Sequence, residues 1–69
     1  MTNTEKLKKI IESKGYKLKY VAEYLGLSAY GFNKKLNNQN EFKTSEISAL
    51  CNLLEIDSLT EKEEIFFAH

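Results

Sequence analysis

Apolar residues recur three and four positions apart along most of the chain, which is the spacing of one face of an α-helix. The pattern predicts five helices, over about 5–14, 18–25, 28–36, 44–54 and 60–67. The 69 residues include no proline and three glycines, so the chain lacks the turn residues that separate the strands of a β protein. We therefore expect an all-α fold, and the length allows one small domain, residues 1–69.

Residues that favour helix ends stand at the expected boundaries. The expected N-terminal caps are Thr2, in a capping box with Glu5, then Ser28, Thr44, and Thr60, in a capping box with Glu63. Gly15 and Gly26 stand where a left-handed residue would end the first two helices. The polar run over 37–40 is expected to form a turn or loop.

The join between the second and third predicted helices is very short, because only Gly26 and Leu27 separate them. Two helices joined so tightly must cross steeply, and the small side chain of Ala22 lets their backbones approach. Gly26 can supply the positive φ of the turn, while Leu27 and Phe32 are expected to point inward. This arrangement is a helix-turn-helix over about 18–37, whose second helix can enter the major groove of DNA.

The stretch over 18–37, LKYVAEYLGLSAYGFNKKLN, resembles the helix-turn-helix of the Cro/CI-like (XRE) repressor family. Residues 7–15 look like the first helix of that family, and residues 44–56 look like its fourth. The resemblance implies a compact five-helix, lambda-repressor-like DNA-binding domain. The segments KLNNQNEFKTSEI and EKEEIFF are also similar to small phage-encoded Cro-like proteins of Gram-positive bacteria.

In that family the first exposed turns of the third helix contact base edges, and residues around it contact phosphates. The resemblance implies base contacts from Ala29, Tyr30, Asn33 and Lys34, with Gly31 allowing close approach to the groove. The phosphate contacts that we expect come from Lys17, Lys19, Ser28, Asn37, Asn38, Asn40 and Lys43. For each of these side chains the alternative is an ordinary packed or solvated position. The same alternative holds more strongly for three tyrosines on and beside the second helix, Tyr16, Tyr20 and Tyr24.

Two residues depart from the family pattern. The second helix of the family commonly opens with a glutamine that clamps a phosphate, but here Leu18 holds that position and cannot donate a hydrogen bond. Lys35 stands where the family usually has an apolar residue, so Leu36 is expected to take over the burial, with the lysine stem along the surface. The first departure shifts phosphate anchoring onto backbone N–H groups and lysines.

Charge is divided unevenly along the chain, although the formal net charge is zero. Residues 1–43 hold nine lysines and four glutamates, a net charge of +5, whereas residues 44–69 hold one lysine and six acids, a net charge of −5. A basic first part indicates an anion-binding face, and the alternative is a lysine surface kept for solubility. The chain has no arginine, which removes the side chain most often used to read guanine.

Several classes of protein are not expected. Cys51 is the only cysteine, so it offers neither a disulfide nor a Cys/His zinc site, and we expect it to be a buried small hydrophobe. The chain cannot assemble a nucleophile, a base and an orienting group, so we expect no enzyme, cofactor, metal or small-molecule ligand. The start, MTNTEKLKK, has no signal-peptide core, and no apolar run approaches the roughly 20 residues of a membrane span. We therefore expect a cytoplasmic protein, with a terminal His69 that is disordered.

The resemblance predicts a transcriptional repressor that binds a near-palindromic operator in double-stranded DNA as a homodimer, formed in solution or only on DNA. The apolar residues after the fourth helix that could supply a dimer surface are Ile56, Leu59, Ile65, Phe66 and Phe67. We assign the surface to Phe66 and Phe67, at least one of which must face outward because neighbours on a helix are about 100° apart. The alternative is that these residues close the core of the chain itself. The alternative function is a protein-interaction module, such as an anti-repressor or an antitoxin-like subunit, that keeps the scaffold without reading an operator.

Overall fold

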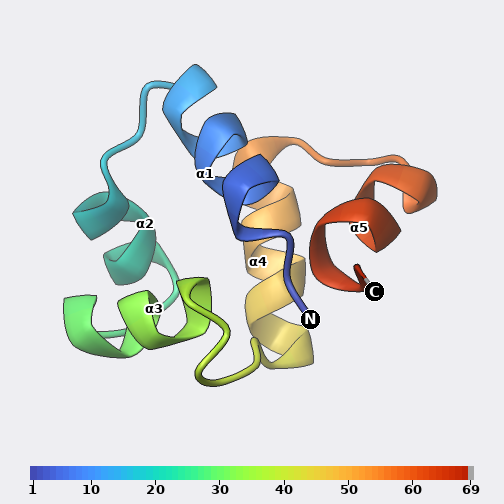
Figure 1. Cartoon of the computed structure of the whole chain (residues 1–69). Coiled ribbons are helices and arrows are strands. Elements are labelled where there is room, and N and C mark those ends of the chain that lie inside the picture. Colours follow the sequence, from blue (N-terminus) through green and yellow to red (C-terminus); the bar gives the residue numbers. More distant parts are fainter. Residues whose placement is uncertain (69) are drawn as a thin grey trace.

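Helix α4, at Thr44–Leu54, lies at the centre of the fold, with helices on both sides of it in Figure 1. In the computed structural model, which describes residues 1–68, the other helices are α1 (Thr4–Ser13), α2 (Leu18–Tyr24), α3 (Ala29–Leu36) and α5 (Leu59–Phe66). In Figure 1, α2 and α3 lie to the left of α4, and α5 lies to its right. The prediction of an all-α fold with five helices is confirmed for these residues. His69 lies outside the described residues.

One hydrophobic core holds the helices together. Its buried members are Leu7, Ile11, Val21, Ala22, Phe32, Leu36, Phe42, Leu50, Cys51, Leu54, Ile56, Ile65 and Phe66. The ring of Phe42, in the loop between α3 and α4, stands edge-on to those of Phe32 and Phe66, at 6.2 Å from each. Cys51 is buried as expected, and desolvation raises the pKa of its thiol. The core therefore connects the helix-turn-helix to α5 through one aromatic side chain.

The N-terminal segment corrects the first predicted cap. Asn3, and not Thr2, caps α1, because its Oδ1 accepts the backbone N–H of Lys6 at 3.2 Å. Thr2 is buried, and its backbone N–H and C=O pair with the side-chain amide of Asn38, both at 3.0 Å. The backbone N–H of Asn3 donates to the carbonyl of Ile65. The segment thus links α5 to the loop that follows α3.

The caps of the later helices also differ in part from the prediction. Ser28 caps α3 and Gly15 follows α1 with φ +80°, as expected. Thr44 is the first residue of α4 and not its cap, which is Lys43. Likewise α5 begins before Thr60. Its cap is Ser58, whose hydroxyl accepts the backbone N–H of Glu61 in place of the expected pair of Thr60 and Glu63. None of the helices described is long and apolar enough to cross a membrane.

Candidate nucleic-acid interface

A tight turn joins α2 to α3. Gly26 adopts φ +73°, a conformation that glycine reaches without a Cβ penalty. The backbone N–H of Leu27 then folds back to the carbonyl of Ala22 at 2.9 Å. Ala22 is buried where α2 meets α3, and the Phe32 side chain of α3 is buried in the core. The sequence-based prediction of a helix-turn-helix at 18–37 therefore corresponds to two helices packed against each other.

Ser28 fixes the start of α3. Its hydroxyl oxygen accepts the backbone N–H of Gly31 at 3.0 Å. A Cβ at position 31 would lie 3.2 Å from that oxygen, which is closer than most side-chain contacts. The lack of a side chain at Gly31 therefore leaves room for the Ser28 hydroxyl that caps α3.

Helix α3 has one buried face and one open face. Phe32 and Leu36 are fully buried, whereas Tyr30 exposes 72% of its surface. Asn33 is exposed and Lys34 is half-buried. The Lys34 Nζ lies 5.2 Å from the centroid of the Tyr30 ring, a cation–π pair at i, i+4. The four residues that the resemblance assigned to base contacts, Ala29, Tyr30, Asn33 and Lys34, thus lie together on the first turns of α3.

Three exposed lysines in the basic part of the chain have no ion-pair partner among the described residues. Lys17 precedes α2, Lys19 lies in its first turn, and Lys43 precedes α4, and all three are exposed. Within residues 1–68 none of them forms an ion pair, whereas Lys6, Lys14 and Lys35 are each paired with a glutamate. These free ammonium groups are the type that binds phosphate.

The loop after α3 has two kinds of asparagine. Asn37 and Asn40 are exposed, and no hydrogen bond engages their side chains within the described part of the chain. Asn38 adopts φ +61° and holds the backbone of Thr2 with its amide. Its assignment as a phosphate contact stays a prediction, and the structure gives this side chain a second role in fixing the loop.

An ion pair that was not predicted anchors the far end of α3. The Lys35 ammonium binds the Glu46 carboxylate on α4, and the two side chains expose 11% and 9% of their surfaces. The same carboxylate accepts the backbone N–H of Lys43 at 2.8 Å. Burial by itself would raise the pKa of Glu46, but the hydrogen bonds from Lys35 and Lys43 and their positive charges together lower it. The only signal for this ion pair in the sequence was Lys35 itself, which stands where the family usually has an apolar residue.

The tyrosines near α2 have structural contacts, as expected. Tyr16 packs against the core and stacks on Tyr20, with ring centroids 5.4 Å apart. Tyr24 is partly exposed, and its hydroxyl accepts a hydrogen bond from the amide of Asn52 at 3.2 Å. Tyr24 therefore links α2 to α4, and Tyr16 packs the segment before α2 against the core.

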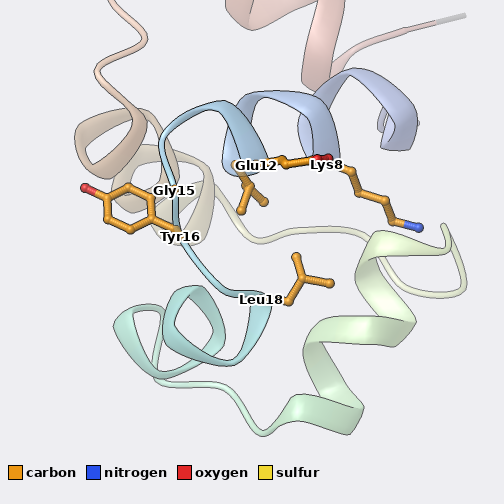
Figure 2. A pocket seen from close by; sticks show the side chains of 6 residues that line it. Lys8, Glu12, Gly15, Tyr16 and Leu18 are labelled. Atoms are coloured by element: carbon orange, nitrogen blue, oxygen red, sulfur yellow. The ribbon is translucent and has the colours of Figure 1, made fainter.

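Leu18 stands between two open clefts. One, of about 470 Å³, lies against α1 and is lined by Lys8, Ile11, Glu12, Gly15 and Tyr16 with Leu18 (Figure 2). In Figure 2 the Leu18 side chain rises from the start of α2 into the space below α1, and the Lys8 side chain points away from Tyr16. The other cleft, of about 430 Å³, lies between the starts of α2 and α3. An apolar side chain therefore occupies the place where the resemblance implies a polar clamp.

The assignment of a dimer surface to Phe66 and Phe67 is half wrong. Phe66 exposes 3% of its surface and packs edge-on against Phe42, so its ring belongs to the core of the chain itself. Phe67, the C-terminal cap of α5, exposes 55% of its surface. Ile56 and Ile65 are buried too, which leaves Phe67 and Leu59 as the open apolar side chains of this region.

Comparison with known families agrees with this geometry. The family model of the Cro/C1-type HTH DNA-binding domain matches residues 6–61, which run from α1 into α5. Comparison with curated proteins and with solved structures gives no match for this chain. The domain of that family binds double-stranded DNA. The match covers most of the chain and includes both helices of the helix-turn-helix, so the protein belongs to the Cro/C1-type helix-turn-helix family and is a DNA-binding regulator.

Proposed function

We propose that the protein is a sequence-specific repressor that inserts α3 into the major groove of its operator. The observation that carries the proposal is the open face of α3, where Tyr30, Asn33 and Lys34 project from a helix whose other face is fixed in the core. An asparagine amide can pair with adenine and a lysine ammonium with guanine, while the Ala29 methyl can contact thymine. A protein seated on an operator then represses by excluding polymerase or a rival regulator.

Phosphate contacts supply most of the affinity in this proposal. Lys17, Lys19 and Lys43 are exposed and form no ion pair within residues 1–68, and the first 43 residues carry a net charge of +5. Each phosphate that a lysine neutralises releases counterions, so the logarithm of the affinity falls by roughly 0.9 for each tenfold rise in salt per contact. Three such lysines support a binding constant that depends steeply on salt.

The proposal includes a second copy of the chain. One recognition helix makes few contacts, and two copies on a near-palindrome would place α3 helices about 34 Å apart in successive major grooves. The contact between copies must then lie away from α3. Phe67 satisfies this condition, because α5 lies on the other side of α4 from α3 (Figure 1), and its ring is more than half exposed.

The test is selection of bound fragments from a random pool of duplexes, followed by transcription in vitro from a promoter that carries the selected site. We expect one enriched near-palindromic sequence and less transcript as the protein is added. Enrichment of no sequence, or more transcript, would contradict the proposal.

A second candidate is a protein-interaction module on the same scaffold. The absence of arginine and the apolar Leu18, with an open cleft on each side, favour it. The net charge of +5 on the part that holds the helix-turn-helix favours DNA. A mobility assay on random duplex at low salt separates the two, because a module that binds only protein should leave the DNA unshifted.

A further inference from the structure

The cleft between the starts of α2 and α3 has apolar walls. Its lining includes the apolar side chains of Leu18 on α2, Leu27 and Ala29, together with the buried side chains of Ala22 and Phe32. Leu18 exposes 40% of its surface, so part of its apolar side chain is open to solvent at the cleft. The cleft therefore favours an apolar group of a DNA duplex, because burial of apolar surface away from water is favourable.

The rim of the cleft carries one charge of each sign and so does not attract the DNA backbone. Glu23 lies on it and forms no ion pair within residues 1–68, so its carboxylate repels phosphate. Asn33 lies on the same rim and belongs to the open face of α3. Lys19 on α2 also lies on the rim, so its ammonium group offsets the charge of Glu23. The rim therefore carries no net charge that would draw a phosphate in, and the apolar lining favours a base edge inside the cleft.

We propose that this cleft receives the 5-methyl group of a thymine in the major groove, which makes Leu18 a specificity-determining residue. The inference rests on the proposed function. Among the four bases only thymine presents an apolar group in the major groove, and phosphates and sugars offer none of that kind there. The cleft is continuous with the base-reading face, because Ala29 and Asn33 belong to both.

The size of the effect follows from one buried methyl group. Burial of one such group changes affinity about fourfold. The expected signature is a fourfold preference for thymine over uracil, at one position in each half-site, that depends on the side chain at position 18.

The experiment uses the full chain and the duplex obtained by selection. Each thymine of the half-site is replaced in turn by deoxyuridine, which removes the methyl group and keeps the base pair. Dissociation constants are measured by fluorescence anisotropy for the wild type, Leu18→Ala and Leu18→Met. We expect the wild type and Leu18→Met to lose about fourfold at one position, and Leu18→Ala to lose less than 1.5-fold there.

Lys19→Ala is the matched control, since it removes a neighbouring side chain on the same rim. It should weaken binding to every duplex and leave the ratio of thymine to uracil unchanged. The proposal is overturned if the wild type tolerates uracil at every position, if the selected half-site prefers no thymine, or if Leu18→Ala keeps the full fourfold ratio. The uracil scan of the wild type decides the first two results even if Leu18→Ala fails to fold. A wild type that binds no duplex at all would instead refute the proposed function, and the two failures are therefore distinct.

Discussion

The ion pair between Lys35 and Glu46 should control both the stability of the domain and its dependence on pH. Glu46→Ala removes the carboxylate and leaves a nearly buried ammonium on α3 without its partner. Loss of one member of a buried pair costs about 3–5 kcal/mol, and an exposed pair is worth under about 1 kcal/mol. The lysine stem keeps some contact with water, so we expect a loss of about 2–3 kcal/mol.

Such a loss is large for this domain. A chain of this length has a total stability on the order of 3–10 kcal/mol, and a loss of 1 kcal/mol lowers the unfolding midpoint by about 4–8 °C. Urea unfolding followed by far-ultraviolet circular dichroism measures the change. We compare Glu46→Ala with a complete double-mutant cycle made of Glu46→Leu, Lys35→Met and the double variant Lys35→Met/Glu46→Leu.

The double variant separates a true pair from two unrelated side chains. It should be less destabilised than the sum of the single changes by about 2 kcal/mol, because apolar replacement of both partners leaves no buried charge. If each single change costs under about 0.5 kcal/mol and the effects add, the pair is a solvated surface contact and our reasoning about it is wrong.

The pH dependence has a definite sign. The pKa of Glu46 is lowered from its ordinary 4.5, so the pair contributes its full stability above pH 4.5 and loses it as the pH falls through the lower folded-state pKa. The difference in stability between the wild type and Glu46→Ala should therefore shrink as the pH is lowered below 4.5. A difference that stays constant through the acid range would refute the pairing.

Three further predictions follow from other parts of the structure. Lys34→Ala should reduce binding to the selected site by about 1–3 kcal/mol more than binding to random duplex. Lys17→Ala should instead weaken binding to all duplexes alike and reduce the salt slope by roughly one. Titrations of both variants at several salt concentrations measure these effects. Ala22→Leu should cost about 1–3 kcal/mol by overpacking the junction of α2 and α3, and an unchanged thermal midpoint would mean that the helices do not meet there. Phe66→Ser should unfold the domain, because the Phe66 ring is buried against Phe42. Phe67→Ser should keep the helical circular dichroism signal and weaken cooperative binding to the two half-sites. A folded Phe66→Ser variant would contradict the packing of Phe66 in the core.

Local pattern in the sequence was enough for the order and type of the helices, because each apolar stripe reports on one helix alone. It was not enough for three of the caps. Thr2 and Asn3 are adjacent, as are Lys43 and Thr44, and Ser58 stands two residues before Thr60, so sequence spacing cannot decide which residue leaves the helical conformation.

Contacts between segments far apart in the chain could not be predicted from the sequence. Lys35 and Glu46 meet only because of how α3 crosses α4, and Asn38 reaches Thr2 across 36 positions in the chain. Helical geometry required one of the two final phenylalanines to face outward, but only the packing against Phe42 identifies the inner one as Phe66. The assignment of base contacts to Ala29, Tyr30, Asn33 and Lys34 came from the resemblance, and the fold adds that these residues lie together on the first turns of α3.

The central claim, that α3 reads a DNA sequence, is tested most directly by the ratio of two affinities. Fluorescence anisotropy at physiological salt measures the dissociation constant of the wild type for the selected duplex and for the same bases in scrambled order. The account predicts that the selected duplex binds at least about 10³-fold more tightly, as specific DNA-binding proteins do. Equal affinity for the two duplexes, or no binding to either, would contradict it.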